Sequence, residues 1–276
     1  MNLILGARGR LGRALLKTLD GIPVDRSVYC DWCREGAEDE IARFVEGSVP
    51  SAGIIFVAAG VIAPNAEPQL YERVNFWLPR NVVAAASRTG WRVVTFGTVM
   101  ETVVGEGVHD PYVASKIRLG RFVSGLGPQI DRIIHIRLHT LYGGGPPNAF
   151  MFLGQMLNAI RYRHPFKMSP GTQLREYHHV DDDALAIGRL VSDGLTGPVD
   201  LSHGEPVMLR TLASRVFEQF GCAQLLEIGA VPAPEHDNYS RTFERVPSLR
   251  KMRFRHTLPG VVEYLRACLS MATTAK

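Results

Sequence analysis

This 276-residue sequence has little of what marks several specialised classes of protein. Its four cysteines are too few for a disulfide framework. No apolar run approaches the length of a membrane span, and the first residues, MNLILG, include neither a basic segment nor a cleavage site. We therefore expect a cytoplasmic protein with no membrane partner.

The sequence also lacks a strong excess of charge of one sign. The formal net charge is +4, and the Lys and Arg residues are scattered along the chain. This argues against a nucleic-acid partner and fits a site for an anionic small molecule. The length suits one large domain or a fused pair, which is enough to enclose a cleft beside a core.

Metal-binding patterns are incomplete. Cys30 and Cys33 form a Cys-x-x-Cys, but a zinc site needs a second ligand pair, so we expect structural thiols. His178 and His179 precede three carboxylates, residues 181–183, which are better interpreted as the acidic N-terminus of a helix. The sequence predicts no metal site.

Short apolar runs alternate with amphipathic segments through the first half of the chain. This alternation predicts an α/β fold of the Rossmann type, a doubly wound parallel sheet covered by helices. We expect strands at 2–5, 22–25, 52–60, 91–97 and 131–138, and helices at 9–19, 38–47, 67–90 and 112–126.

The rhythm changes after LYGGGPPN. Helices are predicted at 149–165, 180–195, 207–221 and from about Pro259. We therefore expect a dinucleotide-binding domain over 1–147 and a smaller, mostly helical substrate-binding region over 148–276, with segments near 175–200 returning to the Rossmann core.

A glycine-rich turn joins the first strand to the first helix. LILGARGRLG places Gly6, Gly9 and Gly12 in a G-x-x-G-x-x-G pattern. Glycines permit a tight turn and the close approach of a pyrophosphate to the helix N-terminus, whose free N–H groups favour an anion. The loop predicts an NAD(P) site that also includes Arg8, Arg10 and Leu11.

The end of the second predicted strand bears on which dinucleotide binds. Asp25 favours the free 2′-hydroxyl of NAD(H), whereas Arg26 and Ser27, assisted by Arg8, could hold the 2′-phosphate of NADP(H). Both patterns are present. NADP(H) is favoured slightly, and NAD(H) stays open.

Three side chains with complementary chemistry follow. Thr98 comes after the fourth strand, and Tyr112 and Lys116 lie one helical turn apart. An ammonium close to a phenol lowers its pKa, and the hydroxyl of Thr98 could bind a substrate oxygen. These groups could protonate an alkoxide as a nicotinamide delivers a hydride.

Together, GARGRLG, AAG at 58–60, VN at 74–75, Thr98 and YVASK resemble the extended short-chain dehydrogenases/reductases. RLHTLYGGG and GTQLREYHHVDDDALAI continue the likeness into the second half. Within that class the chain is most similar to the nucleotide-sugar 4-ketoreductases, the group of dTDP-4-dehydrorhamnose reductase and the CDP- or GDP-deoxyhexose reductases.

The resemblance implies roles for individual residues. Tyr112 would donate the proton, Lys116 would hold the nicotinamide ribose, and Thr98 would bind the sugar carbonyl. Further cofactor contacts are implied for Ala58, Ala59, Gly60 and Asn75, and substrate contacts for Thr140, Asn148 and Arg175.

Departures from the pattern narrow the activity. Dehydratases of the class carry Asp-Glu after the hydroxyl residue, where this chain has Val99 and Met100, and Glu101 is expected to point elsewhere. Gly97 replaces a common second Ser. The short segment between Thr98 and Tyr112 favours a reductase over an epimerase.

We therefore expect reduction of the 4-keto group of a nucleotide-linked 4-keto-6-deoxyhexose by a homodimer. An NAD-dependent nucleotide-sugar 4-epimerase and a non-catalytic NADP(H) sensor are the alternatives.

Overall fold

The computed structural model describes residues 1–48, 53–104, 110–233 and 240–273. The chain separates into two compact units. The first contains residues 1–138, 183–201 and 247–249, and the second contains the remaining residues. Within the described ranges, no helix is long and apolar enough to span a bilayer.

A six-stranded parallel sheet forms the centre of the first unit, in the order β10-β5-β4-β3-β1-β2. Its strands are β1 (Asn2–Leu5), β2 (Ile22–Pro23), β3 (Ile54–Val57), β4 (Arg92–Thr98), β5 (Ile133–Leu138) and β10 (Gly197–Asp200). The order reverses at β1, and the ends of β1 and β3 flank this switch point, where such sheets bind ligands. The predicted fold class is confirmed.

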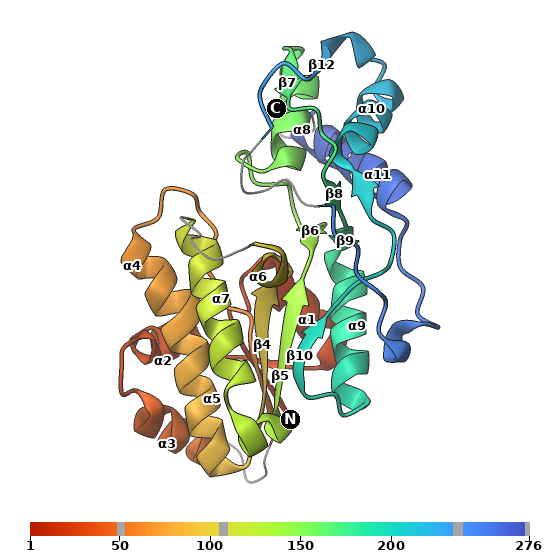
Figure 1. Cartoon of the computed structure of the whole chain (residues 1–276). Coiled ribbons are helices and arrows are strands. Elements are labelled where there is room, and N and C mark those ends of the chain that lie inside the picture. Colours follow the sequence, from red (N-terminus) through yellow and green to blue (C-terminus); the bar gives the residue numbers. More distant parts are fainter. Residues whose placement is uncertain (49–52, 105–109, 234–239, 274–276) are drawn as a thin grey trace. The chain divides into compact units, whose positions relative to one another are not determined.

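Helices cover both faces of this sheet, with α3, α5 and α7 on one side and α1 and α9 on the other (Figure 1). The helices are α1 (Arg10–Leu19), α2 (Arg26–Tyr29), α3 (Glu38–Ser48), α4 (Pro68–Tyr71), α5 (Leu78–Thr89), α6 (Met100–Val103), α7 (Pro111–Ser124) and α9 (Val180–Ser192). Short helical turns lie at Asp31–Cys33, Gly127–Arg132 and Pro247–Leu249.

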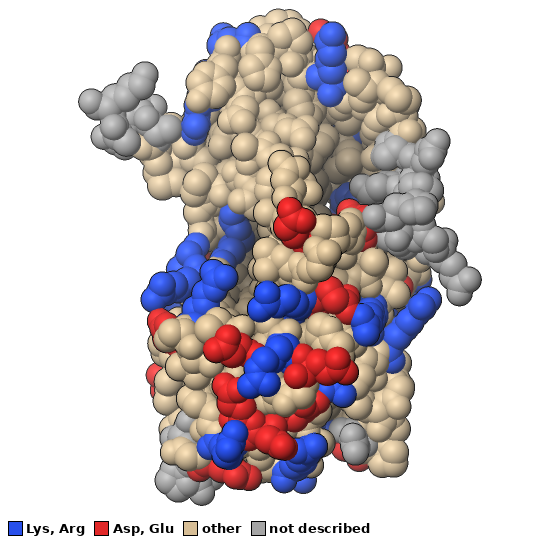
Figure 2. Space-filling model, turned by 90° about the vertical axis from the view of Figure 1, so that its left-hand side faces the viewer, with Lys and Arg blue, Asp and Glu red and all other residues tan. Residues whose placement is uncertain are grey.

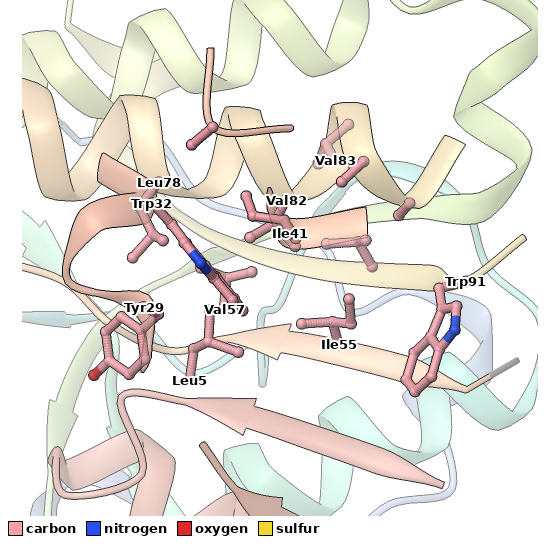
Figure 3. Packing of buried hydrophobic residues seen from close by; sticks show 14 of the residues in the cluster. Leu5, Tyr29, Trp32, Ile41, Ile55, Val57, Leu78, Val82, Val83 and Trp91 are labelled. Atoms are coloured by element: carbon pink, nitrogen blue, oxygen red, sulfur yellow. The ribbon is translucent and has the colours of Figure 1, made fainter. Parts of the chain in front are cut away.

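The core of the first unit lies between the sheet and the helices α3 and α5 (Figure 3). Leu5, Ile55 and Val57 project from β1 and β3 toward Ile41 and Val82, and all five are buried. Each strand places alternate apolar side chains on this face, which is the period that a strand buried on both sides requires. This packing fixes the positions of β1 and β3, whose ends flank the switch point.

The segment predicted as one helix at 67–90 contains an irregularity. α4 leads into a π-helical stretch, Glu72–Trp77, before α5 begins, and Gly90 ends the helix in the left-handed conformation. π-helical turns are rare and are frequently found at functional sites. Asn75 lies within this turn.

Acidic and basic side chains are interspersed over the first unit (Figure 2). Several are paired between helices, including Glu38 with Arg80 and Asp39 with Arg88, which link α3 to α5. Charges of both signs alternate here, as expected from the modest net charge.

Small sheets and helices pack around a separate core in the second unit. The strands β6 (Thr140–Tyr142), β7 (Phe166–Met168), β8 (Leu174–Arg175), β9 (Tyr177–His179), β11 (Val207–Met208) and β12 (Leu226–Ile228) pair as β6-β9, β8-β11 and β7-β12. The helices are α8 (Phe152–Tyr162), α10 (Leu209–Gln219) and α11 (Thr257–Thr273), with a short turn at Ala223–Leu225.

The cysteines are free thiols. Cys222 and Cys268 are buried in the second core, and Cys33 is buried in the first, as structural thiols should be. Cys30 differs because it is exposed, and its thiol donates to the carbonyl of Ser27.

Candidate active site

The glycine loop after β1 forms the tight turn that its sequence predicts. The N–H of Gly9 donates to the carbonyl of Gly6 at 2.9 Å, and Gly6 has a φ of +78°. A Cβ on Gly12 would lie 2.1 Å from the Gly6 oxygen, and one on Gly6 would lie 2.3 Å from the nitrogen of Ala59. Only glycine fits at both places, so the loop passes close to the end of β3.

This turn leads directly into α1, whose N-cap residue, Gly9, supplies no side-chain hydrogen bond to the first turn. The N-terminus of this helix, with the positive end of its dipole, therefore faces the loop, as a pyrophosphate site requires. The tight turn at Gly6, Gly9 and Gly12, set at this helix end, fits a dinucleotide. When bound, a reduced nicotinamide cofactor supplies a hydride.

Asp25, Ser27 and Arg8, which bear on the choice of dinucleotide, contact one another. The carboxylate of Asp25 accepts hydrogen bonds from the backbone and hydroxyl of Ser27, both at 2.9 Å, and from Arg8 at 3.0 Å. The bonds from Ser27 chiefly lower the pKa of Asp25, with a smaller contribution from Arg8. Asp25 is also the N-cap of α2, so Arg26 begins that helix.

Asn75 ties the loop after β3 to α7. Its buried side chain accepts from the N–H of Val61 at 2.8 Å and donates to the Val61 carbonyl at 3.0 Å and to the hydroxyl of Ser115 at 3.3 Å. A Cβ on Gly60 would lie 3.4 Å from the Asn75 amide oxygen. Asn75 therefore supports both Gly60 and the helix that carries Tyr112.

Thr98 is the last residue of β4, and the side chain of Lys116 contacts the backbone of the same strand. The buried ammonium of Lys116 donates to the carbonyl of Phe96 at 2.7 Å. Burial lowers the pKa of Lys116 to about 8, and the negative charge of Glu101 opposes that effect. The structure thus brings Lys116 to the strand end that presents Thr98.

Tyr112 begins α7, where Asp110 caps the helix by accepting from the N–H groups of Tyr112 and Val113. The expectation of a lowered pKa for this phenol is wrong for the chain by itself. Burial chiefly raises its pKa, and the charges of Glu101 and Asp110 raise it further. Tyr112 is therefore a protonated phenol near neutral pH. Part of the short segment before it, residues 105–109, lies outside the described residues.

The expectation that Glu101 points elsewhere is also wrong. One oxygen of its carboxylate accepts from the backbone N–H of Thr98 at 2.7 Å, and the other lies 3.0 Å from Nε2 of His135. Both side chains are buried. The sequence does carry a signal for the first contact, because Thr-x-x-Glu matches the capping-box pattern, in which the glutamate bonds back to the N–H of the first residue, although the N-cap of α6 is Val99. Nothing local marks His135.

Apart from Thr98, the predicted substrate residues lie in the second unit, so they are described separately from the groups above. Arg175 is buried, and it lines a small hollow together with His139, Arg241 and Phe243. Thr140 is half-buried in β6, and Asn148 is half-buried just before α8, where its carbonyl accepts from the N–H of Met151. Arg175 and Arg241 are the two guanidinium groups of this hollow.

A buried cluster surrounds Glu176 in the same unit. Its carboxylate accepts from the Ser202 hydroxyl at 2.8 Å and from the His203 N–H at 2.9 Å, and it lies 3.0 Å from Nε2 of His178. Burial opposes ionisation, but the bonds from His178 and His203 hold the pKa of Glu176 far below its usual range.

Side-chain atoms of Glu176, His139 and His178 lie within 4.8 Å of one another and could hold a metal ion. Burial and the nearby His178 lower the pKa of His139 to about 3, so this imidazole is neutral. The carboxylate of Glu176 also accepts the hydrogen bonds from Ser202 and His203 described above. That the protein has no metal site stays a prediction.

The parallel sheet, the glycine cradle at its switch point and the Tyr112–Lys116 helix define an NAD(P)-dependent oxidoreductase of the extended short-chain dehydrogenase/reductase class. The chain belongs to the NAD-dependent epimerase/dehydratase family, whose pattern matches residues 2–199. No curated protein matches the sequence.

Solved structures share the fold along the whole chain. One is dTDP-4-dehydrorhamnose reductase from Bacillus anthracis str. Ames in complex with NADP, with 20% identity, 96% of this chain and 97% of that chain covered, and a TM-score of 0.74. Another is UDP-glucose 4-epimerase from Thermus thermophilus in complex with NAD, with 18% identity, coverage of 96% and 98%, and a TM-score of 0.71. WbmG from Bordetella bronchiseptica, in complex with NAD and UDP, has 17% identity, coverage of 97% and 96%, and a TM-score of 0.74.

Proposed function

We propose that this protein uses NAD(P)H to reduce the 4-keto group of a nucleotide-linked 4-keto-6-deoxyhexose. The observation that carries the proposal is the arrangement at the end of β4, where Lys116 donates to the Phe96 carbonyl, Thr98 ends the strand, and Tyr112 lies one helical turn before Lys116 on α7. Tyr112 is half-buried and its surroundings raise its pKa, so the phenol holds its proton at neutral pH. Reduction of a ketone begins with a protonated acid beside the carbonyl oxygen, whereas a 4-epimerase begins with a base that removes a hydroxyl proton.

The residues of the first unit have distinct tasks in this reaction. The Thr98 hydroxyl donates a hydrogen bond to the carbonyl oxygen and orients the ketone. As hydride reaches C4, the Tyr112 phenol transfers its proton to that oxygen. The Lys116 ammonium stabilises the phenolate that remains and binds the ribose of the cofactor.

Elimination of water, the reaction of a 4,6-dehydratase, needs an acid and a base directly after Thr98, and this chain has neither there. Val99 and Met100 carry no titratable group. Glu101 is occupied, because its two oxygens bind the Thr98 N–H and His135. This supports a reductase over a 4,6-dehydratase.

We propose that the second unit binds the diphosphate of the substrate at Arg175. The guanidinium groups of Arg175 and Arg241 line the same hollow, and a planar guanidinium matches phosphate oxygens with paired hydrogen bonds. The relatives with this fold include proteins solved with UDP or UDP-glucose, which supports a nucleotide-linked substrate. We assign the diphosphate to Arg175, with Thr140 and Asn148 as sugar contacts.

For the cofactor we propose NADP(H), with NAD(H) as the alternative. Arg8, Arg26 and Ser27 place two cations and a hydroxyl around the expected 2′ position. Asp25 opposes a phosphate there, but Arg8 and Ser27 already neutralise and bind its carboxylate.

The test mixes the purified protein with NADPH and freshly generated 4-keto-6-deoxyhexoses linked to dTDP, CDP, GDP or UDP. We expect oxidation of NADPH with one of these bases, and loss of that activity in Tyr112→Phe. The matched control is Tyr162→Phe, which removes an exposed hydroxyl on α8. No oxidation with any substrate refutes the reductase. Bound NAD with no net turnover, together with interconversion of UDP-hexoses, establishes the epimerase instead.

The same variant distinguishes the enzyme from a non-catalytic NADP(H) sensor. In a sensor, Tyr112→Phe would leave binding of a protein partner intact. The homodimer stays a prediction, which light scattering of the purified protein would check.

A further inference from the structure

The Glu101–His135 pair lies beside the catalytic groups of the first unit, and the proposed reaction does not use it as an acid or base. Nε2 of His135 lies 3.0 Å from one Glu101 oxygen, and Nδ1 lies 2.8 Å from the hydroxyl of Thr95. The register of β4 and β5 pairs Thr95 directly with His135. The imidazole is therefore fixed at both nitrogens, and it holds Glu101 in one position.

Two glycines provide the space that this carboxylate occupies. A Cβ on Gly97 would lie 2.1 Å from Oε1 of Glu101 and 2.4 Å from Nε2 of His135. A Cβ on Gly120, in the middle of α7, would lie 2.3 Å from Oε2 of Glu101. Glycine in a helix interior costs about 1 kcal/mol relative to alanine. Glycine at positions 97 and 120 thus leaves room for the Glu101 carboxylate.

The carboxylate acts on all three predicted catalytic residues. It accepts the backbone N–H of Thr98, which fixes the residue that orients the ketone. Its charge favours the ammonium of Lys116 and disfavours the phenolate of Tyr112. The other titratable groups around this set are His135 on β5, paired with Glu101, and Asp110, which faces Tyr112 from the start of α7.

A helix cap alone does not account for this arrangement. A glutamate in a capping box needs one oxygen for the cap, and glutamine serves that position equally well. Here the second oxygen is paired with a buried histidine, and α6, the helix being capped, has four residues. Removing a carboxylate from water costs several kcal/mol, and here the bonds to the Thr98 N–H and His135 offset that cost.

We propose that Glu101, held by His135, is a positioning residue that fixes Thr98 and keeps Lys116 charged and Tyr112 protonated for reduction. This inference rests on the proposed function, because it assigns the pair to the same catalytic set. Neither side chain touches the substrate or the cofactor.

Glu101→Gln tests the charge without removing the cap. Glutamine keeps the shape and can still accept the Thr98 N–H, so a residue that only caps the helix predicts an unchanged pH profile. Without the carboxylate, the pKa of Lys116 falls below about 8, and the alkaline limb of kcat/KM moves to lower pH by about one unit. We expect kcat to fall more than the KM for substrate changes.

Matched variants separate this effect from general damage. Glu40→Gln removes an exposed carboxylate that pairs with Arg34 on the surface, and its pH profile should equal that of the wild type. Glu101→Ala, which loses the cap as well, should lower kcat further than Glu101→Gln.

A second measurement needs no turnover and so distinguishes failure of this inference from failure of the proposed function. NADPH binding, followed by its fluorescence, should weaken at a lower pH in Glu101→Gln than in the wild type, because Lys116 loses its charge earlier. An unchanged pH dependence of both kcat/KM and NADPH binding would reduce Glu101 to a helix cap and overturn the proposal. If no ketone substrate is reduced but the shift in NADPH binding is seen, the pair stands and the reaction is wrong.

Discussion

The stability effect of Gly120→Ala should change sign when Glu101 is removed. In the wild type, the new Cβ would lie 2.3 Å from Oε2 of Glu101, more than 1 Å closer than ordinary contact. Overpacking of this kind costs about 1–3 kcal/mol, and better helix propensity returns about 1 kcal/mol. Gly120→Ala should therefore destabilise the wild type by about 1 kcal/mol on balance.

In a Glu101→Ala background, the Glu101 atoms that the new Cβ on residue 120 would meet are gone. The next atom from that Cβ is Nε2 of His135, at 3.5 Å, which is an ordinary van der Waals distance. The helix-propensity gain of about 1 kcal/mol is then no longer offset. Glu101→Ala also loses the hydrogen bonds to Thr98 and His135. This loss is the same with and without Gly120→Ala, so it cancels from the comparison. The coupling between the two positions is about 2 kcal/mol, which marks a direct contact.

Thermal unfolding of the four proteins measures this cycle. A change of 1 kcal/mol corresponds to roughly 2–4 °C for a chain of this size. Gly120→Ala should lower the midpoint in the wild type and raise it in Glu101→Ala. The control is Gly47→Ala in α3, where a Cβ meets nothing within 4 Å, so it should raise the midpoint in both backgrounds. A change of the same sign for Gly120→Ala in both backgrounds would refute the reasoning.

Three further predictions concern the cofactor and the lysine. Asp25→Asn removes the charge that repels a 2′-phosphate, so the ratio of kcat/KM for NADPH over NADH should rise about tenfold, or 1.4 kcal/mol, in steady-state assays. Gly12→Ala places a Cβ 2.1 Å from the Gly6 oxygen and should weaken NADPH binding at least tenfold by fluorescence titration, roughly 1.4 kcal/mol. Because burial lowers the pKa of Lys116 to about 8, wild-type turnover should decline above that pH, and an unchanged rate up to pH 10, roughly the ordinary lysine value, would contradict this.

The parts of the site that the sequence predicted correctly are those specified by neighbouring residues. The loop at Gly6, Gly9 and Gly12 is local, because each glycine makes room for the backbone of the same turn or of the adjacent strand end. Gly90 ends its helix in the left-handed conformation for the same kind of reason. The alternation of strands and helices then sufficed for the parallel sheet, because its central strands β1, β3, β4 and β5 are buried on both faces.

Features that depend on distant partners were missed or wrong. The π-helical turn around Asn75 is associated with bonds to Val61 and Ser115, 14 and 40 residues away in the chain. The pKa of Tyr112 was predicted in the wrong direction, because spacing reveals the neighbouring Lys116 but not burial or the charge of Glu101. Sequence spacing identifies which groups can meet, whereas the sign of a pKa shift depends on everything that surrounds them.

The role of Gly97 becomes clear only when the sequence pattern is compared with the contacts in the structure. The sequence identifies Gly97 only as a departure from a serine that is common in the class, at the loss of one hydrogen bond. In the structure a Cβ at this place would overlap both Glu101 and His135, so the missing side chain is the condition for the pair. A serine at 97 would therefore require Glu101 and His135 to shift from these positions. Where the resemblance to the class predicts a serine, this chain has room for a buried carboxylate that accepts the Thr98 N–H.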